Sequence, residues 1–429
     1  MKYQAIDNTL FKLNRSNFIK KLNKNSIAIF QSNDEFPRSG DQNHSFKQNP
    51  DLFYLSGIDQ EQSILALFPD CPNPLYKEVL FLRQTSDLIA VWEGNKLSFQ
   101  EAKKLSGIEK IFWLEDLWTI LPSIINYAET IYLNTNENDR YAHQVPYRDI
   151  RFIEQLKGLY PLHKYERAAP LLRDLRPVKS DIEIALVQKA CDITREAYIR
   201  ILKFIKPGIA EYEIEAEIIH EFIRRGASGH AYAPIIASGK NANILHYTDN
   251  NQVCLDGDVI LFDFGAEYAN YNADLSRSVP VNGKFSKRQK EVYNAVLRIM
   301  KEARKLLAAG TIWNEYHNEV GKIVEAELVG LRLLDKHDIS RQDAAMPLYK
   351  QYFMHGTSHH LGLDVHDFAS RYKPFEEGNI LTCEPGLYIP KEGLGIRLEN
   401  DILITRGGNR DLMADIPIEA EEIEEIMNS

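Results

Sequence analysis

Two patterns of hydrophobic and polar positions divide the chain near residues 170–180. Before that point, short apolar runs such as 64–68 and 79–82 are separated by Pro, Asn, Asp and Gly. Runs of this length, alternating with helical segments such as 98–105, predict the strands and helices of a separate α/β domain. We therefore expect an N-terminal α/β domain over residues 1–174.

After that point, long helical patterns alternate with strands. Ser180, followed by Glu183 three residues later, forms a capping box, and apolar positions then recur at helical spacing until Pro207. Further predicted helices cover residues 212–225, 286–310 and 419–427. Predicted strands cover residues 231–237, 258–264, 276–281, 380–382, 396–398 and 402–405. Helices and strands arranged in blocks predict an α+β domain over residues 175–429.

The composition is that of an acidic globular protein. The 429 residues include 51 Lys and Arg against 61 Asp and Glu, a net charge of −10, and 44% are hydrophobic. This charge argues against nucleic acid as the main partner, because phosphate backbones attract basic surfaces. No run reaches the roughly 20 apolar residues of a membrane helix, so we expect no membrane partner. Four scattered cysteines without a CxxC pair predict reduced thiols in the cytoplasm and no thiolate zinc site.

Acidic residues stand inside segments that otherwise have the pattern of buried strands. Asp263 follows an apolar run, and Asp274 lies eleven residues later, within reach of Asp263 across a hairpin. Glu384 follows another apolar strand, and Arg397 and Glu399 alternate so that both face one side of a strand. One such acid is usually a cap or a solvated residue. Four together require a cation, because two carboxylates about 4 Å apart repel by roughly 4 kcal/mol at an effective dielectric near 20.

Two divalent cations would balance four carboxylates, and histidines are available to complete such a site. Four of the twelve histidines fall within residues 355–366. His355 and His359 are four residues apart, a spacing that suits two metal ligands on one face of a helix. However, the Gly, Thr and Ser between them form helices poorly, and no HExxH motif occurs in the sequence. A lone core histidine is usually structural, which is our expectation for His360. The oxygen-rich set favours manganese or cobalt, and two such ions predict metal-assisted hydrolysis of a substrate.

At these residues the sequence resembles the pita-bread metallopeptidases, and within them the Xaa-Pro aminopeptidase (aminopeptidase P) family. The matching stretches are residues 244–248, 262–265, 273–277, 355–367, 382–388 and 395–399. Residues 49–57 resemble the N-terminal domain of the same family. The resemblance implies an α/β N-terminal domain plus an α+β pita-bread C-terminal catalytic domain.

The resemblance also implies a dinuclear metal site. It assigns two divalent metal ions, manganese foremost, to the ligands Asp263, Asp274, His359, Glu384 and Glu399. In the implied mechanism a hydroxide that bridges the metals attacks the carbonyl while Glu384 shuttles the proton.

Further residues match positions that act on the substrate in this family. His366 matches a histidine that stabilises the oxyanion, and His246 matches one that positions the substrate. Arg397 and Tyr388 match residues that orient ligands and polar substrate groups. His355 matches a residue that lines the apolar pocket for proline.

Two further matches concern a contact between subunits and an arginine near the site. Trp92 resembles a tryptophan that closes the site of a neighbouring subunit, with an ordinary half-buried tryptophan as an equal alternative. Arg176 resembles an arginine that reaches the site. Because relatives form dimers and tetramers, a homodimer or homotetramer is expected.

The expected activity is release of the N-terminal residue from small peptides with proline in second position. The bond before proline has no N–H and a distinctive ring, so it needs a dedicated pocket. Xaa-Pro dipeptidase, with the same fold and metals, remains an alternative. A dipeptidase would cleave Gly-Pro and would leave longer peptides that begin with Xaa-Pro intact. Metal-free pita-bread binding modules and creatinase lack the ligands that are present in this sequence. Methionine aminopeptidase is disfavoured by the long N-terminal domain.

Overall fold

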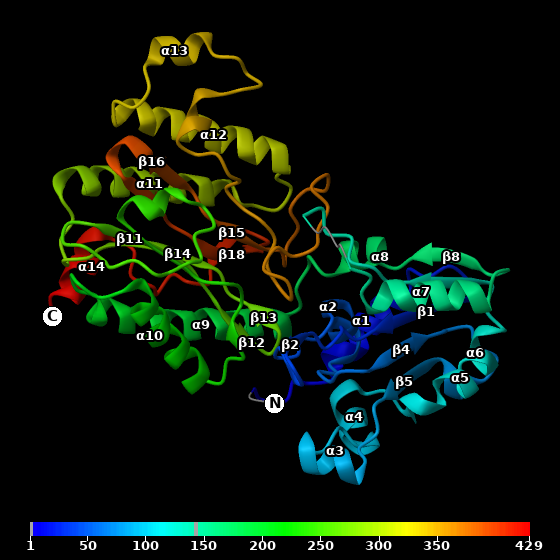
Figure 1. Ribbon diagram of the computed structural model, residues 1–429. Coiled ribbons are helices and arrows are strands. Elements are labelled where there is room, and N and C mark those ends of the chain that lie inside the picture. The colour runs from blue at the N-terminus through cyan, green and yellow to red at the C-terminus, as the bar shows by residue number, and fades with distance from the viewer. Residues whose placement is uncertain (1–2, 141–144) are drawn as a thin grey trace. The chain divides into compact units, whose positions relative to one another are not determined.

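The computed structural model describes residues 3–140 and 145–429, which separate into two compact units. Residues 5–176 form the first unit. Residues 177–429 form the second, together with the short segment 3–4. Figure 1 follows the chain through both units, and each has sheets of its own.

The first unit is built on a mixed six-stranded sheet of order β6-β5-β4-β1-β7-β8. The strand β1 (Ser26–Gln31) pairs antiparallel with β4 (Ile64–Leu67) and parallel with β7 (Thr130–Leu133), and all three are buried along their length. The sheet also contains β5 (Glu78–Leu82), β6 (Lys110–Trp113) and β8 (Lys164–Arg167). A small hairpin pairs β2 (Pro37–Ser39) with β3 (Gln42–Asn43).

Helices accompany this sheet, which confirms the α/β prediction for the first part of the chain. They are α1 (Thr9–Ile19), α2 (Pro50–Ser56), α3 (Asp87–Trp92), α4 (Phe99–Ser106), α5 (Leu117–Ile120), α6 (Pro122–Ile125), α7 (Arg148–Leu159) and α8 (Ala169–Leu175). The predicted helix at 98–105 begins with a capping box between Ser98 and Glu101, which satisfies the free backbone N–H groups of its first turn.

Short antiparallel sheets occupy the centre of the second unit. β11 (Val259–Phe264) lies between β10 (Ile235–Ser238) and β14 (Leu275–Pro280), and β18 (Asn400–Thr405) lies between β15 (Ile380–Cys383) and β19 (Gly408–Asp411). β12 (Ala266–Tyr268) lies between β13 (Tyr271–Asn272) and β9 (Gly229–His230), and β16 (Gly386–Ile389) pairs with β17 (Leu394–Arg397).

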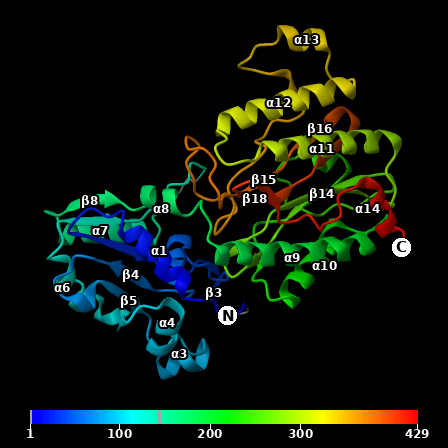
Figure 2. The same ribbon diagram turned by 180° about the vertical axis from the view of Figure 1, so that it is seen from behind.

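Two pairs of helices enclose these strands. In both views α9 (Asp181–Phe204) and α10 (Glu211–Arg224) lie below β11 and β14, and α11 (Lys287–Leu306) and α12 (Trp313–Gly330) lie above them (Figures 1 and 2). The unit is completed by α13 (Lys336–Arg341) and α14 (Ala420–Met427). Strands held between helix pairs confirm the predicted α+β architecture. Among the residues that the structure describes, no helix is both long and apolar enough to cross a membrane.

Three local predictions differ from the structure. The strand expected at 231–237 starts only at Ile235, because Pro234 has no N–H to donate and the chain bends before it. Arg397 ends β17 and Glu399 lies before β18, so the two do not share one strand. The helix expected to reach residue 310 ends at Leu306.

Candidate metal centre

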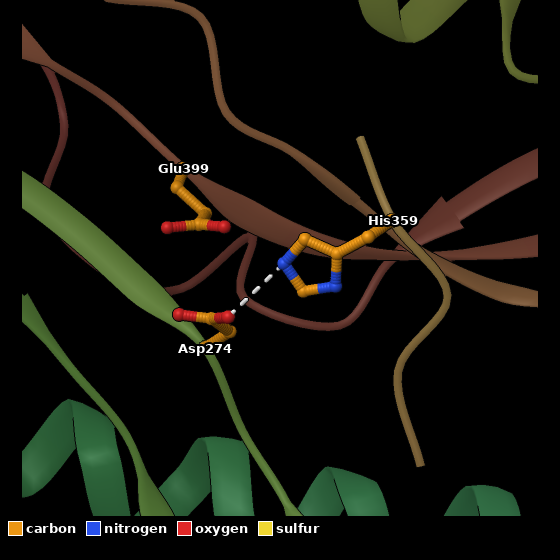
Figure 3. Close-up of side chains that lie close together, drawn as sticks. All are labelled: Asp274, His359 and Glu399. Carbon is orange, nitrogen blue, oxygen red and sulfur yellow. Dashed lines mark ion pairs between the residues drawn. The ribbon is translucent and has the colours of Figure 1, made fainter. Parts of the chain in front are cut away.

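One histidine and two carboxylates from distant segments converge in the second unit. Asp274 precedes β14, His359 lies in the chain before β15, and Glu399 links β17 to β18. Each offers one ligand atom, and these atoms all lie within 4.8 Å of one another (Figure 3). His359 Nε2 lies 3.4 Å from Asp274 Oδ2, and all three residues are buried.

The other two predicted ligands lie beside this cluster. Asp263 pairs with Ser276 across β11 and β14, which places it two residues from Asp274 in the register, so the expected approach across a hairpin is confirmed. Asp263 Oδ2 accepts a hydrogen bond of 2.5 Å from Arg397 Nη2. Glu384 Oε1 lies 3.7 Å from His359 Nε2.

A glycine allows the two aspartate segments to approach closely. A Cβ added at Gly265 would lie 1.7 Å from the carbonyl oxygen of Ala273, the residue before Asp274. The N–H of Ala273 donates to the carbonyl of Ala266 at 3.1 Å, so the backbones are in direct contact there. No larger residue fits between them, and the separation of the aspartates depends on this contact.

Hydrogen bonds fix the orientation of the His359 ring. Its Nδ1 lies 3.0 Å from the carbonyl oxygen of His360, and because a carbonyl only accepts, Nδ1 carries the proton. The Nε2 atom is therefore turned toward Asp274 and Glu384. A second hydrogen bond from the His359 backbone N–H to Thr382 Oγ1, at 3.1 Å, holds the residue against β15. This is the usual arrangement of a metal-binding imidazole.

A chain of hydrogen bonds leads from Arg397 to Glu399. Arg397 Nε donates to Ser276 Oγ at 2.8 Å, and Ser276 Oγ donates to Glu399 Oε2 at 2.7 Å. Glu399 is 1% exposed, and within the described part of the chain its Oε1 has no hydrogen-bond partner. A buried carboxylate oxygen in this condition is costly unless a cation approaches it.

The pKa shifts of the cluster also indicate that its buried carboxylates lack a neutralising cation. Burial raises the pKa of Glu384 to about 7, and it raises the pKa of Glu399 well above its usual range. Burial also raises the pKa of Asp263, although the charge of Arg397 opposes this. For His359, burial acts to lower the pKa, but the hydrogen bond to Asp274 and the charge of Glu384 raise it to about 9. Buried carboxylates that hold protons, next to an orphaned oxygen, fit a divalent cation.

The structure adds two residues that the sequence analysis missed. The hydroxyl of Tyr232 hydrogen-bonds both Asp263 and Asp274. Asp401 Oδ2 accepts the backbone N–H of Asp274 at 3.1 Å and the thiol of Cys191 at 3.3 Å. Tyr232 lies in the bend that was predicted as strand, and no local signal marks a tyrosine as a partner of acids. Asp401 lies two residues after Glu399, and this spacing is the only feature of the sequence that points to a place beside the metal centre.

A second group of predicted residues forms a hydrogen-bonded row. His355 Nδ1 lies 2.7 Å from the carbonyl oxygen of Gly356, so Nδ1 is protonated and Nε2 accepts from the Tyr388 hydroxyl at 2.8 Å. Tyr388 in turn accepts from Arg397 Nη1 at 2.9 Å. Burial lowers the pKa of His355 to about 3, aided by the charge of Arg397. This row therefore presents a neutral imidazole.

The remaining predicted residues are placed as follows. His366 is exposed, and its ring centroid lies 4.4 Å from that of His359 at an interplanar angle of 88°. His246 is exposed in the turn that follows η3 (Gly239–Asn243). In the first unit, Trp92 is 77% exposed at the end of α3, and Arg176 Nη1 donates to Asp51 Oδ1 at 2.8 Å.

Comparison with known proteins gives one consistent result over the whole chain. The model of metallopeptidase family M24 matches residues 185–406, and that of the aminopeptidase P N-terminal domain matches residues 11–132. The Xaa-Pro aminopeptidase of Haemophilus influenzae is 34% identical over 432 residues, with 97% of each chain covered.

Solved structures agree with this result. Aminopeptidase PepP of Pseudomonas aeruginosa has a TM-score of 0.89 and 31% identity, over 99% of this chain and 98% of that one. Zinc-substituted Escherichia coli aminopeptidase P in complex with product has a TM-score of 0.87 and 32% identity, over 99% of both chains. The resemblance to pita-bread metallopeptidases is confirmed. The chain belongs to metallopeptidase family M24, and it carries an aminopeptidase P N-terminal domain ahead of a divalent-metal peptidase domain.

Proposed function

We propose that this metallopeptidase releases the N-terminal residue from peptides whose second residue is proline. The observation that carries the proposal is the buried cluster of Asp274, His359 and Glu399, with Asp263 and Glu384 beside it. Similarity over the full length to Xaa-Pro aminopeptidases supports this class of substrate. In this proposal residues 175–429 act as the catalytic domain.

Five side chains would hold two divalent ions, with manganese as the proposed metal. They are Asp263, Asp274, His359, Glu384 and Glu399. Four carboxylates and one imidazole form an oxygen-rich set of the kind that suits manganese. When bound, such a pair supplies Lewis acidity that polarises a carbonyl and lowers the pKa of water.

Two residues of this chain would then act on the reacting groups. Glu384, whose pKa burial raises to about 7, is able to accept and return a proton near neutral pH. His366 is exposed beside His359, where its ring would hydrogen-bond the carbonyl oxygen as that oxygen gains charge. His246 would hold the substrate.

A neutral, largely apolar wall would receive the proline ring. His355 carries no charge near neutral pH, and the ring of Phe353 lies 4.7 Å from it, edge to face. Tyr388 and Arg397 fix the His355 imidazole through their row of hydrogen bonds. Because the bond before proline has no N–H, such a wall leaves no donor of the substrate unsatisfied.

Kinetics of two variants test these roles on the manganese-loaded protein. We expect Glu384→Gln and His366→Ala to fold and to lose roughly 100- to 1,000-fold in kcat on Ala-Pro-Ala. For Glu384 the reason is the loss of a group that transfers a proton, and for His366 it is the loss of a group that stabilises the oxyanion. The control is His337→Ala, an exposed histidine of α13, which should keep full activity. Unchanged turnover in the first two variants would refute their assignment.

The length of the peptide tests the reaction itself. An aminopeptidase cleaves Ala-Pro-Ala, whereas a dipeptidase cleaves Gly-Pro and leaves the tripeptide intact. Cleavage of the dipeptide alone would replace our proposal by Xaa-Pro dipeptidase.

We further infer a cytoplasmic homodimer or homotetramer. Among the described residues the four cysteines are buried and free, which suits a reducing compartment. The exposed ring of Trp92 is available to a second copy, where it would close the neighbouring site. Sedimentation velocity of wild type and Trp92→Ala measures the oligomeric state and how far Trp92 contributes to the assembly.

A further inference from the structure

An ion pair that is sealed from solvent joins the start of the second unit to the segment that carries His366. Lys179 Nζ donates to Asp367 Oδ2 at 2.8 Å, and the two side chains are 1% and 2% exposed. Gly362 packs over the pair, because a Cβ there would lie 2.4 Å from Asp367 Oδ2 and 3.0 Å from Lys179 Nζ. Desolvation of two charges offsets most of their attraction, so stability alone does not account for this pair.

Lys179 stands on a rigid base. Its backbone N–H donates to the carbonyl of Gly378 at 2.9 Å, just before β15. On one side, Asn379 Nδ2 donates to the carbonyl of Pro177 at 3.1 Å. On the other, Ser180 caps the helix α9. The ammonium group therefore extends from a fixed junction between a helix start and a strand start.

Asp367 closes the segment 360–367 upon itself. Its backbone N–H donates to the carbonyl of His360 at 2.8 Å. Its Oδ1 accepts the N–H of Phe368 at 2.9 Å, while Oδ2 binds Lys179. Each carboxylate oxygen thus has a defined donor, which fixes both the side chain and the turn of the backbone.

The same segment is attached to the metal-binding strands. The carbonyl of Gly362 accepts the backbone N–H and the side-chain Nδ2 of Asn272, each at 3.0 Å, and Asn272 lies two residues before Asp274. His366, the neighbour of Asp367, holds its ring 4.4 Å from the ring of His359. The position of His366 over the cluster therefore depends on where Asp367 is held.

We propose that Lys179 and Asp367 are positioning residues that fix His366 against the metal centre. The inference rests on the proposed function, which gives His366 its role at the substrate carbonyl. It assigns the pair no contact with substrate. The pair acts by holding the turn from which the imidazole projects.

The test removes both charges together, so that neither is left buried alone. Lys179→Met combined with Asp367→Asn keeps the approximate shape of both side chains and leaves an oxygen for the Phe368 N–H. If this double variant does not fold, Lys179→Leu combined with Asp367→Asn serves the same comparison, because it also removes both charges and the hydrogen bond between the two side chains. The control is Arg15→Met with Glu78→Gln, which removes an ion pair of the first unit between a buried arginine and a partly exposed glutamate, joined at 3.0 Å.

The first measurement reports the position of His366 without any substrate. In zinc-loaded protein labelled with ¹³C at histidine Cε1, the signal of His366 is identified by its loss in His366→Ala. We expect it to shift or broaden in the double variant and to stay in place in the control. An unmoved signal in the double variant overturns the inference, and this holds even if the wild type fails to cleave Xaa-Pro peptides, an outcome that refutes the proposed function only.

The second measurement is a kinetic cycle on Ala-Pro-Ala. We expect kcat of the double variant to fall roughly 10- to 100-fold, since a misplacement of about 1 Å at a reacting group can cost about 100-fold. KM should change less than about threefold, because ground-state binding is untouched. In a His366→Ala background the double change should cause no further loss. A full additional loss there would show that the pair acts apart from His366, and the inference would fail.

Discussion

At the scale of single residues, Tyr232 joins two of the proposed metal ligands through one hydroxyl group. Replacement by phenylalanine keeps the ring and removes the hydrogen bonds to Asp263 and Asp274. We expect Tyr232→Phe to fold normally and to bind zinc roughly 10- to 100-fold more weakly, the usual cost of losing a group that orients metal ligands. Isothermal titration calorimetry measures this affinity.

The control for Tyr232→Phe is Tyr247→Phe. Tyr247 also donates its hydroxyl to a buried acid, Glu211 at 2.8 Å, but that acid is not a proposed ligand. Its loss should lower stability and leave zinc affinity intact. Equal weakening in both variants would mean that the hydroxyl of Tyr232 has no specific part in metal binding.

Protons should replace cations in the metal-free site, and this gives a pH dependence with a definite sign. The pKa of His359 is raised to about 9, so it stabilises the fold below its unfolded value near 6.5, and this is lost as pH rises through about 9. Burial raises the pKa of Glu384 to about 7, so its ionisation costs stability from about pH 4.5 upward to about 7. Both effects make metal-free protein less stable as pH rises.

Thermal melts in the presence of a chelator measure this dependence between about pH 5 and 9. The melting temperature should fall across the range, and it should fall less in metal-loaded protein, because a cation takes the place of the protons. Glu384→Gln should flatten the lower part of the metal-free curve. A metal-free melting temperature that rises with pH would contradict the shifts.

Single residues were predictable from the sequence where their type conflicts with their surroundings. Asp263 and Glu384 stand out together with Asp274 and Glu399, because several acids within apolar segments need a cation between them. Tyr232 carries no such conflict, since tyrosine is ordinary in a half-buried strand. The hydrogen bond of its hydroxyl depends on where the chain bends, and the pattern of hydrophobic positions does not contain that information.

At the scale of elements, the turn between β11 and β12 requires a glycine. A methyl group at Gly265 would overlap the carbonyl oxygen of Ala273, so one of the two segments must move. We expect Gly265→Ala to lower the free energy of unfolding by about 1–3 kcal/mol, as overpacking does, and to weaken zinc binding because Asp263 and Asp274 are displaced. Chemical denaturation and calorimetry measure the two effects.

Gly158 provides the matched control for this substitution. It lies inside α7, and no described atom outside its own neighbourhood lies within 4 Å of a Cβ built there. Gly158→Ala should stabilise by roughly 0.4–1 kcal/mol, because alanine has less freedom to lose in a helix. Stability and zinc affinity that remain unchanged in Gly265→Ala would show that the turn can relax without cost.

The starts of elements were more predictable than their partners. Ser98, Ser180 and Ser286 each begin a helix with a capping box, because the signal lies within four residues. The end of β17 at Arg397 was not predictable from alternation. It follows from pairing with β16, a contact between segments that the local pattern does not record. Even so, Arg397 and Glu399 both reach Ser276, so their shared side was predicted correctly.

At the scale of the whole molecule, the metal centre joins segments that are far apart in sequence but belong to one unit. Asp274, His359 and Glu399 are brought together by the pairing of β11 with β14 and of β15 with β18. Charge balance indicated that such acids need cations, yet it did not show which acids meet. The family resemblance identified which acids meet. Spacing along the sequence could not identify them, because long-range strand pairing decides which segments become neighbours.

Because every proposed ligand lies within residues 177–429, metal binding should stabilise that unit and leave residues 5–176 unaffected. A ligand present at 100 times its Kd adds about 2.7 kcal/mol to the stability of the state that binds it. We expect hydrogen exchange, followed by mass spectrometry, to accelerate in β11, β14, β15 and β18 when a chelator removes the metal. Exchange in β1, β4 and β7 should not change.

A variant separates metal binding from other effects of the chelator. Glu399→Gln removes the charge of one proposed ligand of the cluster. Hydrogen exchange in this variant should therefore respond little to chelator at the same zinc concentration. A uniform acceleration through both units would show that the metal stabilises the chain as one cooperative body. Acceleration confined to β1, β4 and β7 would place the metal outside the cluster of Asp274, His359 and Glu399, since a ligand protects the segments whose opening releases it.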